Sequence, residues 1–286
     1  MKFTLYDNVK TFYNDVHGIL MGDEAQNMII LGNLIIGYEG KDTFGWRDPA
    51  NWVMATVGDD AMRLVVLMTP PFGLTLYAVD NKVDAAAVNC LVNGLIAANI
   101  PVPGVVTEKS LAEAFAAAYC GAKGLSHSVA MSQRIYELCE VNPEIPKIGH
   151  FRPAREQDLA FLPFWLADFW AAAGRDSGIS VDIETSRYHV TGGKLYILEV
   201  DGMAVSMAKI TRQTANVAGI GLVYTPPYLR KKGYASAVTA RLSQLCLDTG
   251  TKLCVLYTDL TNPTSNSIYQ KIGYVPICDS LELKFT

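Results

Sequence analysis

Residues 219–240 read GIGLVYTPPYLRKKGYASAVTA, and this stretch decides the fold because it predicts a strand, a basic loop and a helix start in direct succession. A new helix begins with backbone N–H groups that have no intrahelical partner, so an anion can accept from them. Gly233 permits the backbone turn that directs these groups inward, and Ala235 leaves room for close approach. Arg230 and Lys231 add positive charge. The stretch therefore predicts a binding loop for a phosphorylated cofactor.

The loop lacks the Gly-x-x-x-x-Gly-Lys-Ser/Thr pattern of a P-loop and the Gly-x-Gly-x-x-Gly pattern of a dinucleotide fingerprint. Its Arg-x-x-Gly-x-Ala pattern resembles the coenzyme A loop of the GCN5-related N-acetyltransferases (GNAT family). Alone, such a hexapeptide is equally typical of a basic turn before a helix. The resemblance implies that the cofactor pyrophosphate binds the loop residues Arg230, Lys231, Lys232, Gly233, Tyr234, Ala235 and Ser236.

A second motif follows at the expected distance. Residues 251–257 form a short apolar run typical of a buried strand, and Asn262-Pro263 then predicts a helix start. The run 262–274 resembles the second GNAT motif, which implies that Tyr269 lies near the cofactor sulfur. Helical spacing places Asn262, Asn266 and Tyr269 on one face, so we expect all three to face the cofactor, with Tyr269 and Asn262 as the candidate catalytic residues.

The two motifs in this order predict an α/β chain with a mixed sheet and the GNAT acyl-CoA N-acyltransferase fold. The resemblance covers the region from His150 to Thr286. Within it, residues 194–200 and 203–212 alternate as two strands, and Asp201-Gly202 between them is a hairpin turn signal.

The first half repeats the same order of elements more faintly. Helices are predicted at 5–20 and 23–36, followed by three strands, a helix, a strand, a helix, and two strands at 126–131 and 134–141. We therefore predict two GNAT-like units in tandem, a degenerate one at 1–145 and a catalytic one at 146–286. The degenerate unit has no loop glycine and carries Asp80 and Asp84 where a pyrophosphate would sit. An unrelated α/β domain is the alternative for this half.

Composition limits the range of partners. The 286 residues carry a formal net charge of −4, so no general basic field attracts nucleic acid or an acidic membrane. The amino terminus has charges where a signal peptide needs its apolar stretch, and no run is long enough for a membrane span. We expect a cytoplasmic protein. Four scattered histidines without paired spacing predict no metal site.

The resemblance also implies a mechanism, in which an acceptor amine attacks the thioester of acetyl-CoA directly. Strands that splay apart would expose the backbone of Leu222, Val223 and Tyr224 to the pantetheine arm. Tyr269 is the candidate acid, with a packed aromatic as the alternative. The family's strand glutamate is absent from 217–224. Asp259 is a weak candidate base and is equally typical of a turn cap.

The acceptor site is predicted least well. Five aromatic residues lie in the predicted helix at 161–170, and Asp176 and Asp182 follow it. Together they could form the rim of a binding site for a cationic amine. The alternative for the aromatic residues is that they belong to the core. The leading hypothesis is an N-acetyltransferase acting on a primary amine of a small molecule, peptide or protein. An acyl-CoA sensor or scaffold without turnover, or a transferase of a larger acyl group, remains an alternative.

Overall fold

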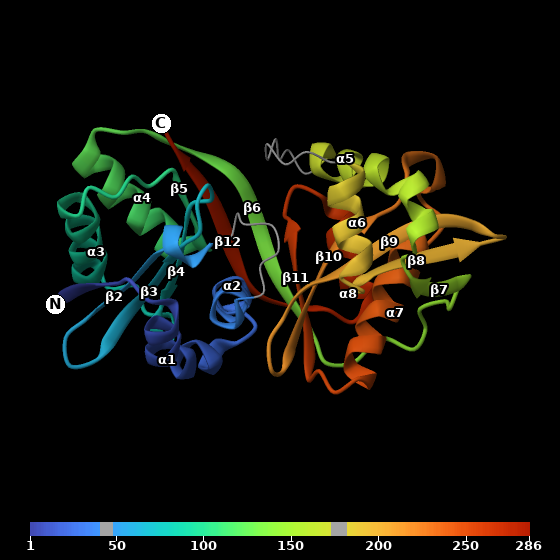
Figure 1. Cartoon of the computed structure of the whole chain (residues 1–286), viewed down its shortest axis with the longest axis horizontal. Coiled ribbons are helices and arrows are strands. Elements are labelled where there is room, and N and C mark those ends of the chain that lie inside the picture. Colours follow the sequence, from blue (N-terminus) through green and yellow to red (C-terminus); the bar gives the residue numbers. More distant parts are fainter. Residues whose placement is uncertain (41–47, 173–181) are drawn as a thin grey trace. The chain divides into compact units, whose positions relative to one another are not determined.

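The computed structural model describes residues 1–40, 48–172 and 182–286 (Figure 1). These residues form two compact units that interleave in the sequence. The first comprises Met1–Ile135, Thr258–Asn262 and Pro276–Thr286, and the second comprises Tyr136–Tyr257 and Pro263–Val275. The prediction has a single boundary at residues 145 and 146, whereas the contacts group the end of the chain with the first unit. The two domain assignments stay a prediction.

The first unit is a sheet in the order β1-β2-β3-β4-β5-β12-β6 with helices packed against it. Its elements are β1 (Lys2–Tyr6), α1 (Val9–Leu20), η1 (Met21–Asp23), α2 (Met28–Glu39), η2 (Pro49–Asn51), β2 (Val53–Gly58), β3 (Met62–Met68), β4 (Leu74–Ala78), η3 (Val79–Asn81), α3 (Ala85–Ala97), β5 (Gly104–Glu108), α4 (Lys109–Lys123), and most of β6 (His127–Leu138) and β12 (Val275–Phe285). Strands β4 and β5 pair in parallel, so α3 is a crossover between them.

Two predictions in this half are wrong in detail. The helix predicted over residues 5–20 begins at Val9, because the Asn8 side chain caps it by accepting from Lys10 N and Thr11 N. The residues before this cap form β1, which pairs with β2 in antiparallel register. The strands predicted at 126–131 and 134–141 are one continuous strand, β6.

Around the predicted loop, the second unit contains a strand, a helix, a parallel strand and a second helix in that order. Its elements are β7 (His150–Pro153), η4 (Glu156–Ala160), α5 (Leu162–Ala172), α6 (Ile183–Thr191), β8 (Leu195–Val200), β9 (Met203–Gln213), β10 (Val217–Tyr224), η5 (Pro227–Leu229), α7 (Tyr234–Asp248), β11 (Leu253–Asp259, of which the last two residues group with the first unit) and α8 (Pro263–Ile272). The strand order is β11-β10-β9-β8-β7, and only the β10 and β11 pair is parallel among the pairs with a described register.

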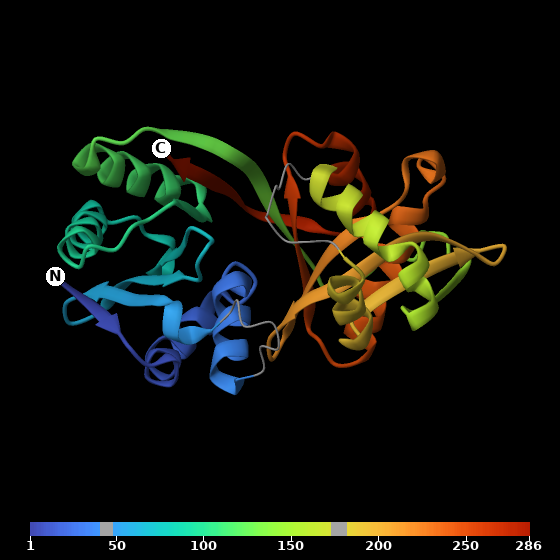
Figure 2. The ribbon, with the colours of Figure 1, turned by 45° about the horizontal axis from the view of Figure 1, so that its top comes forward.

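Helices pack on both faces of this second sheet (Figure 2). On one face, Val238 and Leu242 of α7 and Ile272 of α8 join strand residues in a buried apolar cluster. On the other face, Leu162 and Leu166 of α5 cover a second cluster. The predicted hairpin joins β8 to β9, and Asp201 and Gly202 both take the positive φ of 51° and 75° that such a turn requires.

Candidate functional site

Strand β10 contains a bulge just before the predicted loop. Gly221 opposes Lys209 and Tyr224 opposes Met207, so β10 spends three residue steps where β9 spends two. Leu222 accommodates the extra residue with a φ of 49°, an unusual value for a leucine. Tertiary packing holds this strain, because Leu222 is buried against α5. The bulge turns the last residues of β10 away from regular pairing.

The neighbouring strand diverges at the same level. Within the described part of the second unit, the parallel register of β10 with β11 runs from Val217 and Leu253 only to Gly219 and Val255. Beyond it, the β10 edge at Leu222 and Val223 has backbone groups that an extended ligand can pair with. The carbonyl of Tyr224 accepts from the buried Ser206 Oγ at 2.8 Å, which fixes the backbone at the strand end.

The loop that follows presents an open helix start. Lys231 and Gly233 have φ values of 63° and 80°, and Gly233 is the N-cap of α7. Among the described residues no side chain caps this helix, and the first intrahelical bond is the one from Ala237 N to the Gly233 carbonyl at 3.0 Å. The N–H groups of residues 234–236 therefore have no intrahelical acceptor.

Basic side chains surround this helix start. Arg230 donates from Nε to the Thr225 carbonyl at 3.0 Å, which holds the two ends of the loop together. Lys231 and Lys232 are exposed. A Cβ on Gly233 would meet only Ile148 Cδ1, at 3.6 Å, so the space in front of this residue is open. Dipole, amides and charge all favour an anion here.

The matching helix start in the first unit is closed. The Asp84 side chain caps α3, and its Oδ1 accepts from Ala86 N at 2.8 Å and from Ala87 N at 3.3 Å. Asp80 and Asn81, which precede it, take positive φ values without a glycine. A carboxylate of the chain thus occupies the position that an anion would take.

Tyr269 lies on α8 with only 9% of its surface exposed. Burial raises the pKa of its hydroxyl to about 12, so the phenol is protonated at neutral pH. Its ring meets Tyr274 edge to face at 6.0 Å, and the Tyr274 hydroxyl bonds Ser243 Oγ at 2.8 Å. The Tyr269 hydroxyl has no hydrogen-bond partner within the described ranges, so it is available to a ligand.

The other residues predicted around the second motif make different kinds of contact. Asn266 accepts from the Tyr136 hydroxyl at 3.1 Å through Oδ1. Asp259 caps its turn, because its Oδ1 accepts from both the N–H and the hydroxyl of Thr261 at 2.8 Å. Asp259 and Asn262 group with the first unit by their contacts and Tyr269 groups with the second. Asn262 directly precedes α8, the helix that carries Tyr269, and the role of both residues stays a prediction.

A carboxylate on α5 that no sequence pattern predicted contacts the end of β10. The Tyr224 hydroxyl at the end of β10 donates to Asp168 Oδ2 at 2.8 Å. Burial and the hydrogen bond to Asp168 raise the pKa of Tyr224 to about 12. Asp168 is 56 residues from its partner in the chain, and no local pattern connects them.

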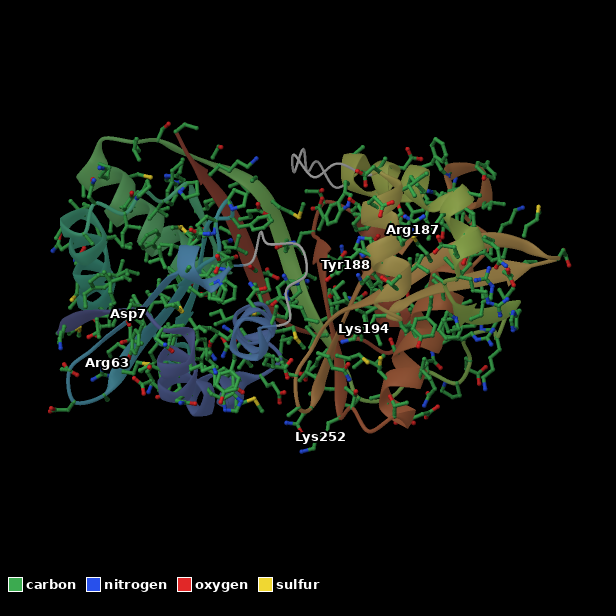
Figure 3. All side chains as sticks on the ribbon, in the orientation of Figure 1. Asp7, Arg63, Arg187, Tyr188, Lys194 and Lys252 are labelled. Carbon is green, nitrogen blue, oxygen red and sulfur yellow. The ribbon has the colours of Figure 1, made fainter. Side chains whose placement is uncertain are left out.

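The aromatic residues of α5 are divided between core and surface. Trp165 is buried and packs on Tyr224 at 5.7 Å, whereas Phe164 is 71% exposed. Asp182 caps α6 by accepting from Thr185 N at 2.8 Å, and Asp176 lies outside the described residues. The Lys209 ammonium lies 5.3 Å from the ring centre of Tyr188, which Figure 3 labels on α6.

Within residues 1–40, 48–172 and 182–286, no group of three or more His, Cys, Asp or Glu side chains could hold a metal ion. The helices of the same ranges are all too short or too polar to cross a membrane.

Known proteins resemble the chain in two ways. Residues 192–281 match the family model described as FR47-like protein. Solved structures match nearly the whole chain. A Drosophila protein matches with a TM-score of 0.68 and 12% identity over 99% of this chain and 98% of that one. A GCN5-related N-acetyltransferase from Sphaerobacter thermophilus matches with a TM-score of 0.63 and 13% identity over 99% of this chain and 95% of that one. A tandem GNAT protein from the clavulanic acid biosynthesis pathway matches with a TM-score of 0.57 and 11% identity over 100% of this chain and 98% of that one. No curated protein matches. The likenesses confirm the predicted fold, including its tandem arrangement.

Proposed function

We propose that this chain, which carries the GNAT fold in two tandem units, is an acyltransferase that takes its acyl group from acyl-CoA. One observation carries the proposal: the uncapped start of α7 at Gly233 follows, after one short loop, the bulged end of β10, which lies beyond the described register of β10 with β11. The first feature suits a pyrophosphate and the second suits a pantetheine arm, and they stand in the order in which coenzyme A presents these groups. The acyl group would then lie beyond the bulge.

The chemistry requires little covalent participation by the protein. The neutral acceptor amine attacks the thioester carbon, a C–N bond forms, the C–S bond breaks to release a thiolate, and the nitrogen gives up one proton to solvent. Tyr269 would donate a hydrogen bond to this sulfur. Because a thiol has an ordinary pKa of about 8.5 and the pKa of Tyr269 is about 12, the phenol would stabilise the thiolate while keeping its proton.

The finer assignments belong to the same proposal. Acetyl is the proposed acyl group, and the acceptor is a primary amine on a small molecule, peptide or protein. The proposed cofactor residues are those of the loop, Arg230 to Ser236, with the backbone of 222–224 and the side chains of Asn262, Asn266 and Tyr269. Asn262 and Asp259 stay predictions for catalysis, and a cytoplasmic location stays a prediction as well.

Calorimetry tests the proposal. Purified full-length protein is titrated with acetyl-CoA, and free thiol is then followed against spermidine, kanamycin, tyramine and a peptide with a free amino terminus. Binding with amine-dependent thiol release is the expected result, and absence of binding contradicts the proposal. Competition by succinyl-CoA tests whether a larger acyl group is preferred.

A sensor without turnover is the second candidate, since no carboxylate lies on β10 to serve as a base. Binding without thiol release from any amine of the panel favours the sensor. Catalysis by any one of them excludes it.

A further inference from the structure

The Tyr224–Asp168 pair lies where the proposed thioester and its acceptor would meet. Tyr224 ends the bulged strand, is 5% exposed, and is followed by Thr225, whose carbonyl holds Arg230 of the loop. Its hydroxyl donates to Asp168 Oδ2, and its ring packs against Trp165 in a tilted arrangement. The tyrosine is thus fixed by the sheet and in turn fixes the carboxylate.

The Asp168 carboxylate is only partly satisfied. Tyr224 is its one hydrogen-bond partner within the part of the chain that the structure describes, and no described cation pairs with it. The residue is exposed. Its Oδ1 is therefore available to a donor from outside the protein, and a carboxylate prefers a cationic donor.

The first unit contains the same pair in a closed form. Tyr77, near the end of β4, donates to Asp23 Oδ2, and Asn81 Nδ2 donates to the same oxygen at 3.2 Å. Gln26 in turn donates to Asn81 Oδ1 at 2.8 Å. If the tyrosine–aspartate pair only held a helical segment against the sheet, this arrangement, in which the carboxylate has a second donor, would be sufficient. The second unit has no counterpart of Asn81 on its carboxylate among the described residues.

Apolar surface lies one helical turn from the open carboxylate. Phe164 and Trp165 precede Asp168 by four and three residues, so they neighbour it on α5. Phe164 also lines a cavity of about 600 Å³ together with Pro163 and Ile183, and Asp182 and Glu184 lie at the same cavity. An exposed aromatic ring beside a carboxylate suits an organic ammonium ion, which both groups attract.

Building on the proposed function, we propose that Asp168 binds the ammonium group of the acceptor, and that the acceptor is a cationic primary amine with an apolar or aromatic portion that packs against Phe164. Tyr224 is the positioning residue, because it orients the carboxylate and need not touch the acceptor. The acceptor thus arrives as an ammonium ion at the end of β10, beside the bulge where the thioester is expected, and its nitrogen loses a proton to solvent before it attacks the thioester carbon.

The test uses 2-phenylethylammonium and its neutral analogue 2-phenylethanol as probes on the full chain, with and without desulfo-coenzyme A. The variants are Asp168→Asn, which preserves an acceptor for Tyr224, and Asp23→Asn, the matched change in the first unit. The wild type and Asp23→Asn should bind the ammonium about tenfold more tightly than the alcohol, as expected for a charge-assisted hydrogen bond. Asp168→Asn should lose this preference.

A wild type that binds both probes equally, or binds neither, overturns the inference, as does an unchanged preference in Asp168→Asn. Acetyl-CoA binding is measured on the same samples and should be equal in all three proteins. Loss of the ammonium preference with retained acetyl-CoA binding therefore separates this inference from the proposed function.

With any amine that the wild type acetylates, Asp168→Asn should raise KM more than it lowers kcat, and Asp168→Glu should bring KM part of the way back to the wild-type value. A fall in kcat alone contradicts a binding role.

Discussion

The two units begin their crossover helices in opposite ways. In the second unit α7 starts at Gly233 with uncapped amides and basic neighbours, whereas in the first unit α3 starts at Asp84, whose own carboxylate accepts from those amides. Both helices connect parallel strands, so the order of elements is the same. This difference teaches that the same order of elements can present either an open or a capped helix start. The proposed coenzyme A site depends on the residues at this one strand-to-helix junction.

The largest expected effect comes from placing a carboxylate at the start of α7, as Asp84 does at the start of α3. Gly233→Asp should weaken acetyl-CoA binding by about a hundredfold or more, because it places a carboxylate and a side chain in front of the open amides. Isothermal titration measures this loss. Gly233→Asn is the control, since Asn tolerates the positive φ and adds no charge. Equal loss in both variants would assign the effect to strain or bulk instead of charge.

The next effect concerns the hydroxyl that is free in the second unit. Tyr269→Phe should lower kcat by about tenfold to a hundredfold with acetyl-CoA affinity nearly unchanged, as expected when a donor acts in the transition state. Steady-state kinetics and calorimetry together check it. Tyr274→Phe removes a hydroxyl that bonds Ser243 and should affect stability only. An unchanged kcat in Tyr269→Phe would make Tyr269 a packing residue.

Alkaline pH should destabilise the fold through the same tyrosine. Its pKa is raised in the folded state to about 12 from the ordinary value of about 10, so the unfolded chain loses its proton first as the pH rises. The stabilising contribution is complete below pH 10 and is lost between about pH 10 and pH 12, by about 2 to 3 kcal/mol. Urea unfolding across this range measures it. Tyr269→Phe should unfold with a shallower pH dependence, and an identical slope in both proteins contradicts the assignment.

The smallest expected effect concerns the capped helix start of the first unit. Asp84→Ala removes the cap of α3 and should cost about 1 kcal/mol of stability, read as a lowered thermal midpoint. It should create no second acetyl-CoA site, because the first unit still lacks the glycine and the basic loop. A second binding event in the variant would show that the cap alone had closed the site.

Local patterns predicted the parts of the fold that depend on neighbours in the chain. The strand, loop and helix around Gly233 and the hairpin at Asp201 and Gly202 follow from residue types whose backbone preferences are strong. The bulge at Leu222 could not be predicted in this way, because leucine has no preference for positive φ and only packing against α5 holds it there.

Pairings between distant segments were also beyond the sequence. Strand β12 pairs with β5 of the first unit although it follows α8 of the second, and nothing in its own residues indicates that partner. The contact between Asp168 and Tyr224 has the same origin. The open helix start at Gly233 could therefore be predicted, because one continuous segment forms it, whereas the contact of α5 with the end of β10 could not.

The most direct test of the central claim is the stoichiometry of acetyl-CoA binding to the full chain by calorimetry. One open and one closed helix start predict a single site per chain, which Gly233→Asp removes. Two sites per chain, or one site that survives Gly233→Asp, would contradict the account.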